Sequence, residues 1–224
     1  TLYRRLKFSC RENRRVVTLK INHGKSEVFN GHGTQCCVDF LRGGTGDGFV
    51  EENVEFARKQ IKNIKWNHDV GFMIYCSFGN GLRLTGDPEY KEVIVEAARS
   101  LSTRFRPVAG IIQSWDVDRG WISERGWECP VIIDNMMNLE LLFAATRLSG
   151  DSTFYKVAVS HVDRTMKEQY RPDGSCYHVV DYSMKDGSVR NRHTTQGYAH
   201  ESAWSRRQAW GIYGLMLCYR ETSC

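Results

Sequence analysis

The sequence predicts an all-α protein in which a ring of buried helices lies inside a ring of surface helices. Two observations support this fold class. Short turns containing Gly-Asp separate segments of helical periodicity, and those segments alternate between amphipathic and almost wholly apolar. An amphipathic helix covers a surface, whereas a helix that is apolar on nearly every side is buried. The alternation of the two kinds along the chain therefore predicts an α/α toroid.

The turn signal occurs three times, as Thr45-Gly46-Asp47, Thr85-Gly86-Asp87 and Ser149-Gly150-Asp151. Glycine suits the left-handed position that ends a helix. The following aspartate can accept backbone N–H bonds at the start of the next helix. Each turn therefore predicts two consecutive helices joined as an α-hairpin.

The segments between these turns predict six helices. The amphipathic ones are residues 50–63, 88–104 and 152–170, and Pro88 suits the first turn of the second. The buried ones are residues 70–84, 135–148 and 203–219. We expect the first group on the outside of the ring and the second group on the inside.

In such a ring the inner helices run parallel, so their N-termini gather at one mouth. Polar residues stand before all three inner helices: Asn67-His68-Asp69, Asp134-Asn135 and His200-Glu201-Ser202. The loop 171–200 adds His178, Asp181, His193 and Gln196. Asp and Asn are also good N-caps, so capping remains an alternative at each single helix. Two carboxylates converging with histidines nevertheless favour a functional site.

The side chains at this mouth suit acid–base chemistry on a sugar. Of two carboxylates facing one pocket, an apolar wall can keep one protonated while the other stays ionised. Tryptophan rings can stack on the apolar faces of a sugar, although the position of Trp204 and Trp210 on an inner helix slightly favours core packing for these two. Arg206 begins an apolar helix, where a cation is poorly placed unless it meets an anion. That anion could be a carboxylated substrate, or the side chain of Glu201 or Asp134.

Composition excludes several other classes of function. The net charge of +5 comes entirely from residues 1–48, which hold nine Lys/Arg and four Asp/Glu, so the rest is balanced and nucleic-acid binding is not expected. No apolar run of about 20 residues could span a membrane, and no signal-peptide core opens the chain, so we expect a soluble protein of undetermined compartment. The eight cysteines are scattered and no motif has metal-ligand spacing, so neither a metal nor an organic cofactor is expected.

Several motifs resemble the unsaturated glucuronyl hydrolases of glycoside hydrolase family 88. They are His68-Asp-Val-Gly-Phe-Met73, Ser114-Trp-Asp116, Pro130-Val-Ile-Ile-Asp-Asn-Met-Met-Asn-Leu-Glu-Leu-Leu142, Tyr177-His-Val-Val-Asp-Tyr182, Gln196-Gly-Tyr198, Glu201-Ser-Ala-Trp-Ser-Arg206 and Gln208-Ala-Trp-Gly211. The resemblance runs from about residue 50 to the end of the sequence, and the motifs occur in the family's order.

The resemblance implies an (α/α)6 barrel and an unusual reaction. Such enzymes protonate and hydrate the C4=C5 double bond of the unsaturated uronic acid that polysaccharide lyases leave on glycosaminoglycan fragments. The hydrated product opens and releases the neighbouring sugar. The implied partner is therefore an unsaturated uronyl di- or oligosaccharide. By the same resemblance Asp134 is the general acid/base, which needs a raised pKa. Asp69 is the second essential carboxylate. The implied substrate-binding residues are His68, Trp115, His178, Gln196, Trp204, Arg206 and Trp210.

The chain departs from this pattern in three ways. A twelve-helix ring needs at least about 210 residues before any long loops, yet only six helices are predicted, so the barrel should be incomplete. Residues 1–48 do not resemble the family and form a basic, irregular or disordered segment before the partial barrel at 49–224. Arg207 stands where the family usually has glycine, and we expect it to crowd the helix entrance.

Two alternative functions remain open from the sequence. An unsaturated rhamnogalacturonyl hydrolase would share the fold and chemistry but act on pectin fragments. The chain could also be an inactive fragment or a helical sugar-binding module, because later hairpins of the barrel are missing.

Overall fold

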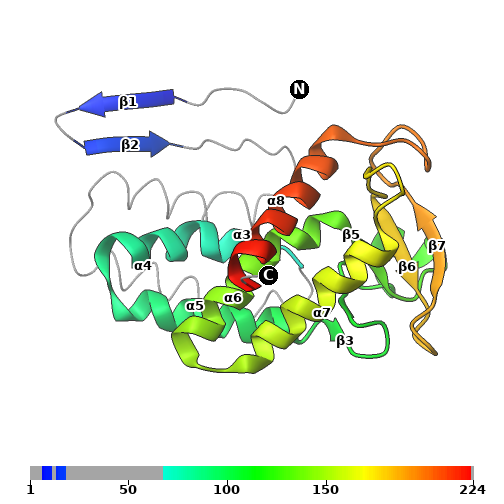
Figure 1. Cartoon of the computed structure of the whole chain (residues 1–224), viewed down its shortest axis with the longest axis horizontal. Coiled ribbons are helices and arrows are strands. Elements are labelled where there is room, and N and C mark those ends of the chain that lie inside the picture. Colours follow the sequence, from blue (N-terminus) through cyan, green and yellow to red (C-terminus); the bar gives the residue numbers. More distant parts are fainter. Residues whose placement is uncertain (1–6, 12–13, 19–67, 223–224) are drawn as a thin grey trace.

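Helices form most of the chain that the computed structural model describes, which is residues 7–11, 14–18 and 68–222 (Figure 1). The helices are α3 (Val70–Ile74), α4 (Asn80–Thr85), α5 (Pro88–Ser102), α6 (Leu139–Ser149), α7 (Ser152–Glu168) and α8 (Ser205–Thr222), with a π-helical turn η1 (Tyr75–Gly79) and the 3₁₀ turns η2 (Gly120–Arg125) and η3 (Ile133–Asn138). The strands are β1 (Lys7–Arg11), β2 (Arg14–Thr18), β3 (Phe105–Arg106), β4 (Ile111–Ile112), β5 (Pro130–Ile132), β6 (Val179–Tyr182) and β7 (Val189–His193).

Two of the three predicted helix-to-helix turns are confirmed. Gly86 and Gly150 end α4 and α6 with φ of 72° and 77°, in the left-handed region. In the following residues, Asp87 and Asp151 cap α5 and α7, each accepting a backbone N–H bond of 2.9 Å. The third turn signal, at residues 45–47, and the predicted helix 50–63 lie outside the described residues. The antiparallel hairpins of helices therefore follow directly from the Gly-Asp signal where the structure can be compared with it.

The main hydrophobic core lies between α3, α5, α6 and α7, as the alternation of buried and amphipathic helices predicts. Its fully buried members include Val70, Val93, Ile94, Leu101, Leu139, Leu141, Leu142 and Ala158. These residues come from both kinds of predicted helix, and α6 is buried on most sides, whereas the segment 70–84 is only partly buried. The prediction of a third helix buried on nearly every side, at residues 203–219, is wrong for the described part of the chain, because α8 leaves Ile212, Tyr213, Met216 and Tyr219 exposed.

Two of the predicted inner helices are interrupted rather than continuous. The segment 70–84 passes through the π-turn η1, where the Ser77 hydroxyl donates to the Met73 carbonyl at 2.9 Å. The segment predicted from residue 135 begins earlier, as the 3₁₀ turn η3, and becomes α-helical only at Leu139. Polar side chains that bond to the backbone compete with the regular helical pattern. The second of these interruptions, η3, contains Asp134 of the candidate site.

A three-stranded antiparallel sheet, β5–β6–β7, lies at one end of the helical part (Figure 1). Its register pairs Val131 with Val180 and Val180 with Arg192. The prediction that residues 171–200 form a loop is therefore wrong. All four residues of β6 are buried and β7 is almost wholly polar, so neither strand shows the alternation that identifies a half-buried strand.

Within the basic segment 1–48 the described residues form an antiparallel pair, β1 and β2, in which Lys7 lies opposite Thr18. The rest of that segment and residues 49–67 lie outside the described residues. The boundary between a basic segment and a partial barrel at residue 49 therefore stays a prediction.

His161 on α7 should make the fold less stable in acid. The ring is fully buried, its Nδ1 accepts the Ile112 N–H at 3.0 Å, and burial lowers its pKa to about 3. The unfolded chain takes up this proton near pH 6.5, so this contribution to stability is present above that pH. It is lost on acidification, by up to about 1.4 kcal/mol per pH unit.

Denaturant unfolding between pH 7 and pH 4 measures this effect. His161→Asn, which keeps an acceptor but does not titrate, should show a shallower loss of unfolding free energy than the unsubstituted chain. Other buried histidines contribute equally to both proteins, so equal slopes would refute the assignment to His161.

Candidate active site

Four of the predicted site residues form one wall of aromatic rings. The ring centroids of His68 and Trp115 are 6.1 Å apart, those of Trp115 and His178 are 6.5 Å apart, and those of His178 and Trp204 are 5.7 Å apart. All three pairs meet edge to face. The wall thus joins the start of α3, the connection after β4, the residue before β6 and the residue before α8.

The loop carrying Trp115 is tied to the turn carrying Asp134. The Ser114 hydroxyl donates to Asn135 Oδ1 at 3.1 Å and accepts the Ile132 N–H at 2.9 Å. The Ser114 hydroxyl, the Asn135 side chain and the Ile132 N–H are all buried, and a buried polar group that lacks a hydrogen bond is costly. Trp115 and Asp134, each one residue from a member of the network, therefore hold fixed relative positions.

Arg104 supports the same loop from the end of α5. Its side chain is almost fully buried and donates to the carbonyls of Gln113 and Ser114 at 2.8 and 3.2 Å. It also pairs with Asp116 at 2.9 Å. A planar guanidinium can serve several acceptors at once, so one residue fixes the backbone on both sides of Trp115.

The start of α3, which carries Asp69, lies against η3, which carries Asp134. Asn138 Oδ1 accepts the Phe72 N–H at 2.9 Å. A Cβ at Gly71 would lie 2.6 Å from the Asn138 carbonyl oxygen, so only glycine permits this approach. The two predicted catalytic carboxylates are therefore carried by segments in direct contact.

Neither carboxylate caps a helix through its side chain, so the capping alternative is wrong for both. Asp69 occupies the N-cap position of α3 but its side chain makes no capping bond. Asp134 lies inside η3, whose N-cap is Ile132. Asp134 is nevertheless only 9% exposed, and a carboxylate is almost never buried without a partner.

The partner of Asp134 is Arg207, whose guanidinium forms an ion pair with its carboxylate and also donates to Gln196 Oε1. Arg207 is 4% exposed, so it enters the site rather than merely crowding the helix entrance as expected. One feature of the sequence points to this role, namely a second arginine in the first turn of an apolar helix. Asp134 and Glu201 were the predicted alternatives to a substrate anion for Arg206, but Asp134 pairs with Arg207 and Glu201 pairs with Arg171 at 3.7 Å.

Arg206 faces the tryptophans instead. Its guanidinium carbon lies 4.3 Å from the ring centroid of Trp204 and 5.3 Å from that of Trp210. Arg207 approaches the same rings at 4.6 and 4.9 Å. Both tryptophans are only partly buried, so they line the site together with the arginines and are not core residues.

His178 is neutral at pH 7, because burial lowers its pKa to about 4. Its Nδ1 accepts the Thr195 N–H at 3.2 Å, which assigns the ring proton to Nε2. Nε2 is buried and has no hydrogen-bond partner among residues 68–222. His178 can therefore donate one hydrogen bond to a ligand between Trp115 and Trp204.

His68 lies beside the second carboxylate. Its Nε2 lies 3.2 Å from Asp69 Oδ1, and it makes a hydrogen bond to the Ser114 backbone. Burial lowers the pKa of His68, and the Asp69 charge opposes this. The Asp69 side chain is 43% exposed, so this carboxylate is far better solvated than Asp134.

The nine predicted site residues thus belong to one connected cluster. Two carboxylates in different environments, neutral histidines and tryptophan faces can together bind a sugar and move a proton. Among the described residues no group of three or more His, Cys, Asp or Glu could hold a metal ion. None of the helices in the described part is long and apolar enough to cross a membrane.

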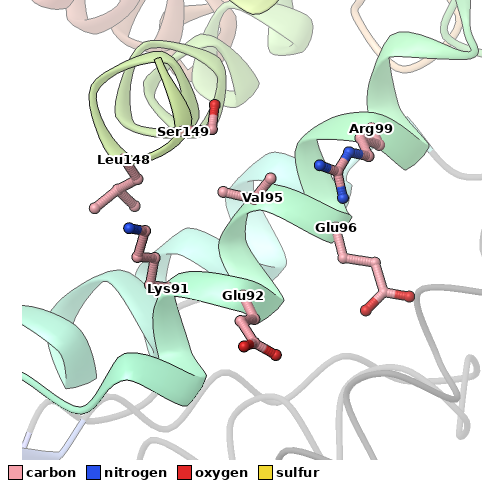
Figure 2. Close-up of a pocket in the computed structure, with 7 residues that line it drawn as sticks. All are labelled: Lys91, Glu92, Val95, Glu96, Arg99, Leu148 and Ser149. Carbon is pink, nitrogen blue, oxygen red and sulfur yellow. The ribbon is translucent and has the colours of Figure 1, made fainter. Parts of the chain in front are cut away.

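A separate hollow lies on the outer surface between α5 and the end of α6 (Figure 2). It is lined by Lys91, Glu92, Val95, Glu96, Arg99, Leu148 and Ser149. It contains none of the nine residues, and its charged side chains extend from the outer face of α5. The hollow is not part of the candidate site.

The close packing of α8 on η3 should be sensitive to substitution at Gly214. A Cβ at this position would collide with Met136, two residues after Asp134. Gly214→Ala should lower the unfolding free energy by about 1–3 kcal/mol. It should also reduce activity by moving η3. Met216→Ala, at an exposed position of the same helix, is the control for thermal unfolding. Equal melting temperatures for the two variants would contradict the packing argument.

Comparisons with known proteins identify relatives of about twice this chain's length. No protein-family model matches the chain. It is 48% identical over 183 residues to an unsaturated glucuronyl hydrolase of Formosa agariphila, covering 80% of this chain and 44% of the relative. It is 36% identical over 157 residues to an unsaturated chondroitin disaccharide hydrolase of Streptococcus agalactiae, covering 69% and 38%. The chain thus spans less than half the length of these curated relatives.

Solved structures agree with the sequence relatives. An unsaturated glucuronyl hydrolase specific for heparin superposes with a TM-score of 0.71 at 39% identity, over 86% of this chain and 50% of that one. The unsaturated glucuronyl hydrolase of Bacillus sp. GL1 gives 0.74 at 28% identity, over 95% and 55%. This likeness confirms the predicted (α/α)6 barrel class, of which the chain contains a part.

Proposed function

The chain belongs to the unsaturated glucuronyl hydrolases, and from that membership we propose that its cluster hydrates the C4=C5 double bond of an unsaturated uronyl sugar. Hydration would remove the uronic acid from a lyase-generated glycosaminoglycan oligosaccharide. The observation that carries the proposal is the contrast between two carboxylates on touching segments, with Asp134 buried and the Asp69 side chain 43% exposed.

In the proposed reaction Asp134, once protonated, donates its proton to C4 of the double bond. Positive charge then develops at C5 and the ring oxygen. Water attacks C5, and a carboxylate accepts the proton that this water releases. The resulting hemiketal opens, and the neighbouring sugar leaves. Asp69 is the second carboxylate of the pair, and its Oδ1 lies 3.2 Å from His68 Nε2.

The remaining residues are proposed to bind the sugar. Trp115 offers a stacking surface, as do Trp204 and Trp210 once the guanidinium groups that lie over them move aside. The unpartnered Nε2–H of His178 offers a donor. Arg206 supplies positive charge for the uronate carboxylate, and Gln196 supplies an amide. The reaction as written consumes only water, so it requires no cofactor.

The names of the relatives support glycosaminoglycan fragments as the substrate class. Three of them are unsaturated chondroitin disaccharide hydrolases, and one related solved structure is a complex with dGlcA-GalNAc6S. A second candidate, action on unsaturated rhamnogalacturonan from pectin, uses the same chemistry. A sugar-binding module without turnover is the third.

The experiment that separates these candidates compares unsaturated disaccharides from chondroitin, heparin and rhamnogalacturonan at equal concentration. Loss of the ultraviolet absorbance of the C4=C5 bond reports turnover, and calorimetry reports binding. We expect faster loss with a glycosaminoglycan disaccharide. Faster loss with the pectin disaccharide would favour the second candidate, and binding without any loss would favour the third.

A further inference from the structure

The guanidinium of Arg207 occupies the middle of the candidate site. Arg207 lies in the first turn of α8, 4% exposed, and contacts the carboxylate of Asp134 and the amide oxygen of Gln196. Its guanidinium carbon is 4.6 Å from the ring centroid of Trp204 and 4.9 Å from that of Trp210. Arg207 therefore contacts four of the nine predicted site residues.

The contact between Arg207 and Asp134 leaves hydrogen-bonding capacity unused. Arg207 Nε and Asp134 Oδ1 are buried and have no hydrogen-bond partner in the described part of the chain. Buried polar atoms without partners are costly, so this arrangement is poised to accept a ligand. Burial lowers the pKa of Arg207 to about 10, against the opposing charge of Asp69, so the guanidinium stays charged at neutral pH.

Two consequences follow for a sugar entering the site. A ring that stacks on Trp204 or Trp210 must compete with the guanidinium groups of Arg206 and Arg207, which both lie over these rings. A buried arginine that leaves its carboxylate without finding another anion pays a large desolvation penalty. A substrate with an anionic group besides its uronate carboxylate can pair with Arg207 and so avoids this penalty, whereas a substrate without such a group cannot.

We propose that Arg207 is a positioning and specificity residue. Before substrate binds, it holds Asp134 as a carboxylate. When substrate binds, Arg207 releases Asp134 and pairs instead with an anionic group on the sugar next to the uronate. While Arg207 is bound, Asp134 stays ionised and cannot donate a proton. Once released, Asp134 can be protonated by solvent and act on C4. This inference rests on the proposed function, since it assigns Asp134 the role of proton donor.

Other charged and titratable groups surround the Asp134–Arg207 pair and remain in place when Arg207 is replaced. They are His68 and Asp69 at the start of α3, Arg104 after α5, His178 before β6 and Arg206 on α8. A change in the pH dependence of the rate that is caused by Arg207 alone must therefore be measured as a difference between variants, not as an absolute value.

The test compares kcat/KM for sulfated and unsulfated unsaturated chondroitin disaccharides, both of which carry the uronate carboxylate. In Arg207→Ala the preference for the sulfated disaccharide should fall about tenfold. The alkaline limb of the pH profile with the unsulfated disaccharide should move up by about one pH unit, because the proton donor no longer faces this cation. A purely structural role would lower both rates alike and leave the limb in place.

Arg207→Lys is the matched variant, since it keeps a charge but loses the planar fork that can bridge two acceptors. It should retain part of the preference, and it supplies the measurement if thermal unfolding shows that Arg207→Ala does not fold. An unchanged preference or an unchanged limb in a folded variant overturns the inference and leaves the proposed function standing.

Where turnover is too slow to follow, calorimetry gives the preference as the ratio of the affinities for the two disaccharides. There, too, an unchanged ratio overturns the inference. If neither disaccharide is bound or turned over by the unsubstituted chain, the proposed function is wrong and the inference falls with it.

Discussion

Asp134→Asn should reduce kcat/KM on an unsaturated glycosaminoglycan disaccharide by about a hundred- to ten-thousandfold, the usual range for the loss of a general acid. The amide keeps the shape of the carboxyl group but cannot deliver a proton to C4. Asp134 is the buried member of the carboxylate pair, held in η3 beside the network of Ser114 and Asn135. The expected loss is therefore in kcat, with a smaller change in KM.

The control for Asp134→Asn is Asp163→Asn, on the exposed face of α7. The control variant should keep full activity and an unchanged melting temperature. Asp134→Asn also leaves Arg207 without its anion, so its fold must be checked by the same melt. A folded Asp134→Asn protein with normal turnover would remove Asp134 from the mechanism.

Asp181→Ala should lower the free energy of unfolding by about 3 kcal/mol. Asp181 lies in β6, is fully buried, and accepts the backbone N–H groups of Glu128 and Cys129 at 3.0 and 2.9 Å. It also pairs with Arg190 at 2.7 Å. Removing it leaves the buried N–H of Cys129, the partly buried N–H of Glu128 and a partly buried cation without their acceptor, and each of these losses is costly.

The loss should appear in denaturant unfolding and should also reach the site, because β6 begins directly after His178. Asp163→Ala, at an exposed position, is the comparison and should cost less than about 0.5 kcal/mol. Burial alone would raise the pKa of Asp181, and the hydrogen bonds and Arg190 oppose that effect. Equal stability of the two variants would mean that Asp181 does not hold the sheet together.

Local chemistry made much of the helical part of the fold predictable. Gly86 and Gly150 mark helix ends because few other residues adopt a positive φ, and the aspartates that follow them mark helix starts for an equally local reason. The segments beginning at Pro88 and Ser152 have one apolar face, which fixes how each lies on the core. Each of these features depends on a few neighbouring residues.

The sheet was not predictable, because strand β6 is buried on both faces and its partners lie far away in the sequence. Val180 pairs with Val131, 49 residues earlier, and with Arg192 in a strand of polar residues. A short apolar run of this kind cannot be distinguished from loop or helix by its periodicity.

The convergence of the site could be predicted, but its charge pairing could not. Parallel inner helices imply that His68, Asp134 and Trp204 meet at one mouth, and the contacts that link them fit that geometry. Which of two adjacent arginines turns inward depends on the rotation of α8 on η3. That rotation is set by the glycine contacts at Gly211 and Gly214, which the sequence does not show.

The central claim is hydration of the C4=C5 bond by this cluster. The most direct measurement is turnover of an unsaturated chondroitin disaccharide in heavy water, with early quenching, mass spectrometry of the released uronate and simultaneous recording of the ultraviolet absorbance. We predict loss of the absorbance together with one deuterium bound to carbon at C4, and neither change with Asp134→Asn. Release of the neighbouring sugar with the absorbance retained and no deuterium at C4 would contradict the account, because the bond would then have been cleaved without hydration.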